Sequence, residues 1–169
     1  MIKSGVCGKD LTWTLDEDGS LTISGEGEMD DYFIYEAAWF YEIVEKIIIR
    51  QGVTSIGDSA FIGCSSLTSV TIPESVTSIG SDAFGGCNSL TSVTIPEGVT
   101  SIGDDTFYDC SSLTSVTIPK SVTSIGFEAF YGCSSLTDIY YTGSESGWNA
   151  IKTDNWLPLD VTIHWTADL

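Results

Sequence analysis

The sequence predicts a β-rich solenoid, in which short coils stack on one another and share one continuous core. The segment Val-Thr-Ser-Ile-Gly occurs four times, starting at residues 53, 76, 99 and 122, so each copy follows the last by 23 residues. A fixed repeat of about 20 to 50 residues is typical of solenoids, whose units bury their apolar faces against their neighbours. The other positions that keep this step are Phe61, Phe84, Phe107 and Phe130, Cys64, Cys87, Cys110 and Cys133, and Leu67, Leu90, Leu113 and Leu136.

Each repeat is predicted to contain two extended segments and a turn. Within residues 67–89, Val70 and Ile72 alternate with polar residues, which indicates a strand whose apolar side faces the interior. Pro73 ends this strand, because proline has no N–H to donate to a sheet. A second extended segment follows. Residues 81–87 are then expected to form one turn of helix, which places a Phe and a Cys in the interior.

Residues 1–43 are expected to form an N-terminal cap. Leu11–Leu15 and Leu21–Ile23 alternate apolar and polar residues around a Gly-containing turn, which predicts a β-hairpin that covers the first coil. The acidic turn also resembles the start of a calcium loop at Asp16. The twelfth position of such a loop requires a bidentate Glu, and this sequence has Gly27 there. A plain hairpin turn is therefore the interpretation.

The cap is joined to the repeats by an aromatic segment. We interpret the aromatic residues between positions 32 and 41 as packing between the cap and the first coil, with a short helix over residues 36–41. A ligand platform is the alternative. The apolar residues at positions 44, 47 and 49 lie 23 residues before the apolar positions 67, 70 and 72 of the first full strand. The repeats are therefore expected to begin with half a unit at residue 44 and to end at residue 141.

Residues 142–169 are expected to close the C-terminal end of the stack. Ser144 is a suitable N-cap for a helix that runs through Ile151, with Trp148 and Ile151 on its inner face. Residues 161–165 alternate as a final edge strand. His164 is expected to be an outward residue of this strand and not a catalyst.

Composition excludes several classes of partner. The 169 residues include 6 basic and 24 acidic side chains, which give a formal net charge of −18. Six cations do not form a basic surface, so binding to nucleic acid or to an anionic membrane through such a surface is excluded. No apolar run reaches the length of about 20 residues that a membrane-spanning helix needs. Met1–Lys3 is followed by Ser, Gly and a polar segment, so no secretory signal is expected within this sequence. We expect one soluble, monomeric domain that attracts cationic partners.

The four repeated cysteines are predicted to be buried thiols. Equivalent residues of stacked coils lie about 4.8 Å apart and point in parallel directions, whereas a disulfide needs Cβ atoms near 3.8 Å that incline towards each other. A zinc site needs ligands that converge on one point, and one Cys per coil does not provide them. The fifth cysteine, Cys7, lies outside the series and has no predicted role.

The complete repeat resembles a known family. The strand pattern Leu-x-x-Val-x-Ile resembles the leucine-rich repeat, and the additional Ile-Pro, Val-Thr-Ser-Ile-Gly, Ala-Phe and Gly-Cys elements are similar to the BspA-like (Treponema pallidum type) leucine-rich repeat family of bacterial surface proteins. Residues 11–25, 140–151 and 161–165 resemble the ends of such domains. The resemblance implies a right-handed leucine-rich-repeat-type solenoid with short helical turns and a parallel sheet. Where the general pattern has Asn or Cys, this sequence has Ser75, Gly98 and Ser121, so no buried Asn ladder is expected.

The sequence does not favour an enzyme. Nucleophilic catalysis needs a nucleophile, a base and an orienting group within hydrogen-bond reach. His164 is the only His, the repeated Cys are assigned to the core, and the acidic pairs at 30–31 and 104–105 are typical of solvated loops. Neither a P-loop nor a dinucleotide fingerprint is present. No catalytic, cofactor or metal site is expected.

A protein-binding module is the favoured function. The resemblance implies a secreted or cell-surface location, and adhesion to host extracellular-matrix proteins or to bacterial surface proteins. One alternative is a structural spacer within a larger surface protein. An ice-binding solenoid is another, because rows of Ser and Thr line the strand face. Ser in place of Thr and the curvature expected of leucine-rich repeats both count against it.

Two surfaces compete as the binding site. Interfaces draw most of their energy from a few aromatic anchors within a polar rim, which favours the variable turns of the third and fourth repeats over the hydroxyl-rich strand face. Stacking should make Tyr108 and Tyr131 neighbours. The turn candidates are Asp104, Asp105, Tyr108, Asp109, Phe127, Glu128 and Tyr131. The strand-face candidates are Lys46, Ile48, Ser69, Thr71, Ser92, Thr94, Ser115, Thr117, Asp138 and Tyr140.

Overall fold

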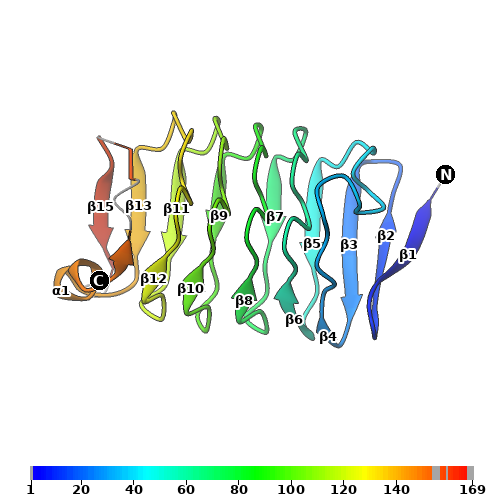
Figure 1. Ribbon diagram of the computed structural model, residues 1–169, viewed down its shortest axis with the longest axis horizontal. Helices are drawn as coiled ribbons and strands as arrows, with labels where there is room; N and C mark the ends of the chain where they lie inside the picture. Colours follow the sequence, from blue (N-terminus) through cyan, green and yellow to red (C-terminus); the bar gives the residue numbers. More distant parts are fainter. Residues whose placement is uncertain (1, 154–156, 159, 167–169) are drawn as a thin grey trace.

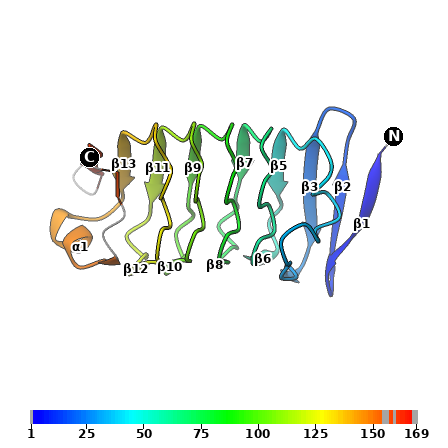
Figure 2. The same ribbon diagram turned by 45° about the horizontal axis from the view of Figure 1, so that its top comes forward.

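The computed structural model describes residues 2–153, 157–158 and 160–166, and it shows a parallel β-solenoid with almost no helix (Figures 1 and 2). Its strands form three sheets. The first contains, in spatial order, β1 (Lys3–Gly8), β2 (Leu11–Leu15), β3 (Ser20–Gly25), β5 (Lys46–Ile49) and β7 (Ser69–Thr71). The second contains β14 (Lys152–Thr153), β12 (Ser124–Ile125), β10 (Ser101–Ile102), β8 (Ser78–Ile79), β6 (Val53–Ile56) and β4 (Gly27–Glu28). The third contains β15 (Thr162–Trp165), β13 (Asp138–Tyr141), β11 (Ser115–Ile118) and β9 (Ser92–Thr94).

The predicted register holds within the repeats. In the third sheet Val93 lies opposite Val116, and Val116 lies opposite Ile139, so equivalent residues of successive coils face each other. The parallel strands alternate between buried aliphatic residues and more exposed polar ones, as the period of two requires. We call the first and third sheets together the strand side. The second sheet runs along the lower edge of Figure 1.

The prediction of one continuous sheet on the strand side is wrong at one step. β7 ends the first sheet and β9 ends the third, so the two neighbouring coils are not paired there. Val70 and Ile72 are only half-buried, whereas the equivalent Val93 and Ile95 are buried. We call this interruption the seam.

The turns differ from the one-turn helices that the sequence predicted. We call residues 57–66, 80–89, 103–112 and 126–135 the turn side. In each of them the third residue is left-handed although it is not Gly, with φ between 50° and 56° at Ser59, Asp82, Asp105 and Glu128, and this conformation prevents a regular helix. The backbone donors therefore bond to the next coil. Phe61, Phe84 and Phe107 each donate an N–H to the residue just before the next Phe, at 2.8, 2.9 and 2.9 Å respectively.

The core on the turn side is a column of phenylalanines and thiols. Phe61, Phe84, Phe107 and Phe130 are all buried, and successive ring centroids lie 5.4, 5.6 and 5.4 Å apart. The repeated cysteines are buried as predicted. They also have a polar role that the sequence did not reveal, because three of the thiols donate to the carbonyl of the Phe in the preceding coil. These bonds join Cys87 to Phe61 (3.4 Å), Cys110 to Phe84 (3.1 Å) and Cys133 to Phe107 (3.1 Å).

Serine hydroxyls bond between coils at the position where the general leucine-rich repeat pattern has Asn or Cys. The Ser75 hydroxyl donates to the carbonyl of Val53 at 2.7 Å and accepts from the N–H of Gly52 at 3.2 Å. Ser121 makes the equivalent pair of bonds to Val99 and Gly98, at 2.7 and 3.2 Å. A hydroxyl that both donates and accepts satisfies two backbone groups, which is the role of a side-chain ladder between coils.

The N-terminal cap is larger than the predicted hairpin. β2 and β3 form that hairpin, β1 adds a third antiparallel strand, and β3 pairs in parallel with β5, so the cap continues the stack. Cys7 in β1 is buried in the same core. Burial and the nearby Asp30 raise its pKa to about 11. Residues 36–41 form turns and not the predicted helix.

The C-terminal cap largely follows the prediction. α1 (Glu145–Asn149) begins after Ser144, whose hydroxyl accepts the N–H of Gly147 at 3.3 Å. The helix is shorter than predicted and ends before Ile151, which is buried, while Trp148 is half-buried. β15 pairs in parallel with β13 and forms the last strand of the third sheet.

Candidate binding surfaces

The turn-side candidates of the third and fourth repeats lie together, and we call them the tyrosine site. The rings of Tyr108 and Tyr131 stack with centroids 5.5 Å apart and an interplanar angle of 17°, as expected for neighbouring coils. Phe127 and Tyr131 are 48% and 45% exposed. Asp104 has a structural role, because its Oδ1 accepts the N–H of Phe127 at 2.8 Å. The site therefore presents aromatic surface above a carboxylate that holds the turn.

Asp109 is the unusual residue of the tyrosine site. The other three turns have Gly at this position, namely Gly63, Gly86 and Gly132, with φ between 70° and 76°. Asp109 adopts the same left-handed conformation with φ 54°, which costs a residue with a Cβ about 1 kcal/mol. Its Oδ1 lies over the next coil, only 1.9 Å from where a Cβ on Gly132 would stand. Gly132 thus leaves room for this carboxylate beside the stacked rings.

The electrostatics of the tyrosine site favour a cation. The pKa of Tyr108 is raised, chiefly by Asp109, then by burial and by Tyr131 and Glu128. The pKa of Asp105 is also raised, by burial and by the neighbouring Asp104. Negative charge is thus among the causes of both shifts, from Asp109 at Tyr108 and from Asp104 at Asp105. A partner that brought a Lys or Arg side chain would relieve this repulsion.

The strand-face candidates lie in rows on both sides of the seam. Ser92, Thr94, Ser115 and Thr117 pair across β9 and β11 in regular rows. The seam separates these rows from the rows that include Ser69 and Thr71 on β7 and Lys46 and Ile48 on β5.

The far end of the strand face contains a cluster that the sequence did not reveal. His164 Nε2 lies 2.6 Å from Asp138 Oδ1, and the ring of His164 stacks on Tyr140 with centroids 4.7 Å apart. The hydroxyl of Thr137 and the ring of His164 lower the pKa of Asp138. Two of the predicted strand-face residues, Asp138 and Tyr140, are therefore joined by the histidine that was predicted only to face outward.

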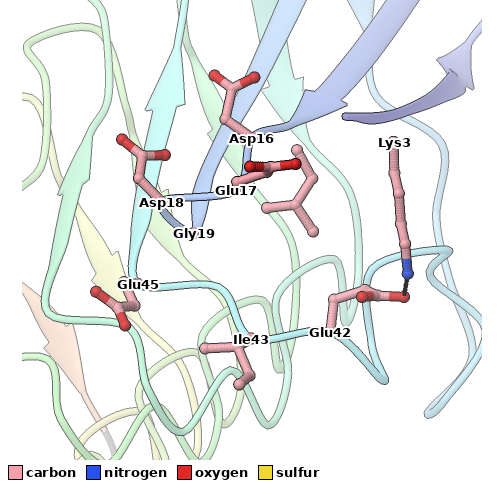
Figure 3. Close-up of a pocket in the computed structure, with 9 residues that line it drawn as sticks. Lys3, Asp16, Glu17, Asp18, Gly19, Glu42, Ile43 and Glu45 are labelled. Atoms are coloured by element: carbon pink, nitrogen blue, oxygen red, sulfur yellow. Dashed lines mark hydrogen bonds and ion pairs between the residues drawn. The ribbon is translucent and has the colours of Figure 1, made fainter. Parts of the chain in front are cut away.

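A further surface lies in the N-terminal cap, where the sequence predicted only packing. A pocket of about 580 Å³ opens between the β2–β3 turn and residues 42–45 (Figure 3). Carboxylates dominate it, and Lys3, which pairs with Glu42, is the one basic residue in its lining. Its lining consists of Lys3, Leu15, Asp16, Glu17, Asp18, Gly19, Glu42, Ile43 and Glu45.

The aromatic segment beside this pocket is only partly a packing element. Trp39 is buried, but Phe33 and Tyr41 are 80% and 82% exposed. The sequence did carry a signal for this, because residues 30–45 contain five acidic and no basic residues among their aromatics. Acidic residues among the aromatic ones indicate that part of this segment faces solvent and does not only pack between the cap and the first coil.

Comparison with known proteins settles the family. The family model described as the BspA type leucine rich repeat region matches residues 33–150 with six copies. The chain belongs to this family. The six copies exceed the four and a half units predicted from the sequence. Among curated proteins, none matches this chain.

Solved leucine-rich repeat proteins share this fold. A leucine rich cell surface protein from Faecalibacterium prausnitzii is 31% identical, with a TM-score of 0.71, over 89% of this chain and 43% of that one. A leucine-rich repeat protein from Eubacterium ventriosum is 29% identical, with a TM-score of 0.67, over 87% and 45%. The Treponema pallidum leucine rich repeat protein is 26% identical, with a TM-score of 0.59, over 93% and 84%. This BspA-type chain thus spans less than half the length of the first two proteins.

The family membership of this BspA-type repeat protein bears on its general role. Among the described residues, no group of three or more His, Cys, Asp or Glu is arranged to hold a metal ion. No helix in this part of the chain is long and apolar enough to cross a membrane. The family and the solved neighbours are repeat proteins consistent with a protein-interaction module.

Proposed function

We propose that this chain is a non-catalytic protein-binding module of a secreted or surface-displayed bacterial protein, and that the tyrosine site binds a cationic side chain of the partner. The observation that carries the proposal is Asp109. It occupies a left-handed position that the other turns give to Gly, and it places a carboxylate beside the stacked tyrosines. Strained residues of this kind concentrate at functional sites.

The chemistry of the site suits Lys or Arg. A cation over the face of an aromatic ring gains from the ring quadrupole, and it gains further from nearby carboxylates. The exposed parts of Phe127 and Tyr131 supply the apolar surface that an interface needs at its centre. A net charge of −18 adds long-range attraction, so association should be fast at low salt and slower at high salt.

Surface display and adhesion are the biological setting that we infer. One of the similar solved structures is that of a leucine rich cell surface protein, and the family resemblance implies adhesins that bind host matrix or bacterial surface proteins. The acidic surface argues against nucleic acid and anionic membranes as partners, and for a monomer, because two such chains repel each other. Limited proteolysis of intact cells that express the native gene tests the location. Complete protection of the domain would contradict it.

The binding site is tested by measuring affinity for a panel of purified extracellular-matrix proteins and for intact bacterial cells. The variants are Tyr108→Ala/Tyr131→Ala for the tyrosine site and Thr71→Lys/Thr94→Lys for the strand face. We expect the tyrosine variant to lose about tenfold or more in affinity, as truncated aromatic anchors do, and the strand-face variant to bind as the wild type does.

A matched variant separates binding from folding. Asp109→Gly removes the carboxylate and restores the residue of the other turns, so it should weaken binding while the fold becomes more stable. Loss of binding only in the strand-face variant would move the site to the strand face, with the Asp138–His164 cluster as its end. Binding by none of the proteins would favour the spacer function instead. A thermal-hysteresis measurement tests the ice-binding alternative directly.

A further inference from the structure

A second surface with the character of an interface lies at the opposite end of the solenoid. We call residues 30–45, between β4 and β5, the cap loop (Figure 1). Phe33, Ile34, Tyr35, Tyr41 and Ile43 are all more than half exposed. Isolated exposed apolar residues are ordinary on proteins, but several large ones in one short segment mark an interaction surface.

Trp39 anchors the cap loop to the core. Trp39 is 1% exposed, and its Nε1 donates to the carbonyl of Ala60 at 2.8 Å. Its ring lies 5.8 Å from that of Phe61, the first ring of the core column, and 5.6 Å from that of Trp13 in the cap. The exposed residues on both sides of Trp39 are thus presented by an anchored segment, which lowers the entropy cost of binding.

The exposed rings form a contiguous group. The centroid of Phe40 lies 4.7 Å from that of Tyr35 and 5.0 Å from that of Tyr41. Phe40 itself rests on the first turn, with its ring 3.1 Å from where a Cβ on Gly63 would stand. Tyr35 has φ 74°, a left-handed conformation that is uncommon for a bulky residue. The backbone therefore bears strain in the position that brings Tyr35 against Phe40 and out into solvent.

All charged side chains of the cap loop itself are acidic. Residues 30–45 contain five acidic and no basic side chains. Glu42 and Glu45 of the loop face the acidic β2–β3 turn across the pocket (Figure 3). Lys3 from β1 reaches the rim and forms an ion pair with Glu42. An ammonium group of the chain itself thus already pairs with one carboxylate of this pocket.

We propose that the cap loop and its pocket are a docking site for a basic segment of a partner protein. Apolar side chains of the segment cover the rings of Tyr35, Phe40 and Tyr41, and a Lys or Arg enters the pocket among the carboxylates of Glu42, Glu45 and the β2–β3 turn. Charge decides between occupants, because a second copy of this chain and an anionic lipid surface both bring negative charge to an acidic surface. The tyrosine site lies in the third and fourth repeats, so this inference does not depend on the function proposed above.

The test uses a labelled peptide that alternates Lys or Arg with Leu and carries one photoreactive residue. Its control is the same peptide with Glu at every basic position. Fluorescence anisotropy with the whole chain should show binding of the basic peptide that weakens with salt, and no binding of the acidic one. After illumination, mass spectrometry should place the cross-links within residues 30–45 or the β2–β3 turn.

Substitutions in the cap loop separate docking from general attraction between opposite charges. Tyr41→Ser should weaken binding of the basic peptide about tenfold, since it removes an exposed aromatic anchor and no buried contact. Glu45→Gln should reduce both the affinity and its dependence on salt. Tyr140→Ser, an exposed tyrosine at the other end of the stack, is the matched control and should bind as the wild type does.

Three results would overturn the inference. Equal affinity of all variants would mean that the net charge alone attracts the peptide. Cross-links distributed along the whole chain would mean the same. Sedimentation that showed a dimer for the wild type and a monomer for Tyr41→Ser would identify a second copy as the occupant and not a basic partner.

Discussion

The strand side and the turn side of the solenoid hold successive coils together in different ways. On the turn side, backbone hydrogen bonds run from coil to coil at Phe61, Phe84 and Phe107, directly over the stacked rings of the core column. On the strand side, pairing stops at the seam between β7 and β9. The stack stays intact across this step. Pairing on the strand side at every step is therefore not what keeps these coils in register, and the second sheet still pairs β8 with β10 across the same step.

The free energy from a backbone hydrogen bond is smaller than that from a buried Phe, and this explains why the stack stays intact at the seam. A backbone hydrogen bond contributes about 0.5–1.5 kcal/mol net, because the unfolded chain bonds to water instead. Truncation of a buried Phe to Ala costs about 3–5 kcal/mol. Each coil adds one such Phe to the column, and the loss of a few strand bonds at the seam is small beside it. The predictions below test this comparison.

The largest effect is expected at the centre of the column. Phe107→Ala removes a ring that stacks on both Phe84 and Phe130, and it should lower the free energy of unfolding by about 3–5 kcal/mol. Thr94→Ala on the exposed strand face should change it by less than about 0.5 kcal/mol. Urea unfolding followed by circular dichroism measures both. If the two substitutions cost the same, the turn side does not dominate stability.

The thiols of the turn side should make the protein sensitive to alkali. Burial raises the pKa of Cys64 and of Cys133 to about 12, whereas an unfolded thiol titrates near about 8.5. The folded chain keeps its protons longer, so stability is full below pH 8.5 and falls as pH rises towards 12. One such thiol accounts for about 1–2 kcal/mol at pH 10.

Unfolding of the wild type and of Cys133→Ala at pH 8 and pH 10 measures this loss. The variant is less stable at pH 8, because it lacks the buried sulfur, but it should lose less stability between the two pH values. An identical loss in both proteins would show that the thiol does not titrate on unfolding. Native thiol labelling should also be slow at all four repeated cysteines, because they are buried.

Hydrogen exchange should reveal the seam. The N–H of Thr114 donates to the carbonyl of Thr91 at 2.8 Å, whereas the N–H of the equivalent Thr91 makes no such bond to β7. We expect the Thr91 amide to exchange about tenfold or more faster than that of Thr114, since local opening there breaks fewer contacts. The Phe84 amide, which lies in a turn beside the seam and bonds to Thr106, should stay protected. Equal protection of Thr91 and Thr114 would contradict the seam.

The smallest expected effect concerns the strained turn. Asp109→Gly relieves the left-handed conformation at φ 54° and should raise the free energy of unfolding by about 1 kcal/mol. Gly132→Ala should lower it, because the new Cβ would stand 1.9 Å from the Asp109 carboxylate. The double variant should recover part of that loss. Lower stability of Asp109→Gly would mean that the carboxylate serves the fold and not a partner.

Much of the architecture was predictable because it depends on local pattern. The 23-residue step predicted which Phe, Cys and Leu are buried, since equivalent residues of a stack share one environment. Ser144 identified the start of α1, because N-capping depends only on neighbouring residues. The same step placed Tyr108 beside Tyr131. These inferences needed no knowledge of contacts between distant segments.

The turns were mispredicted because two local preferences competed. The spacing of Phe84 and Cys87 suits a helical face. Each turn, however, contains a left-handed residue that prevents a helix, so its backbone N–H groups donate to carbonyls of the next coil. The bonds from the Ser75 and Ser121 hydroxyls to neighbouring coils have the same origin. A partner about 23 residues distant is supplied by the stack and not by the local sequence.

By itself, then, the sequence determined the repeat, the core positions and the acidic surface, because these follow from periodicity and composition. Only the tertiary structure decided the seam, the burial of Cys7, and the division of the cap loop into a buried Trp39 and exposed rings. All three depend on how adjacent coils and the cap meet in space. The order of residues along the chain does not show which aromatic residue of this loop packs against the adjacent coil and which one faces solvent.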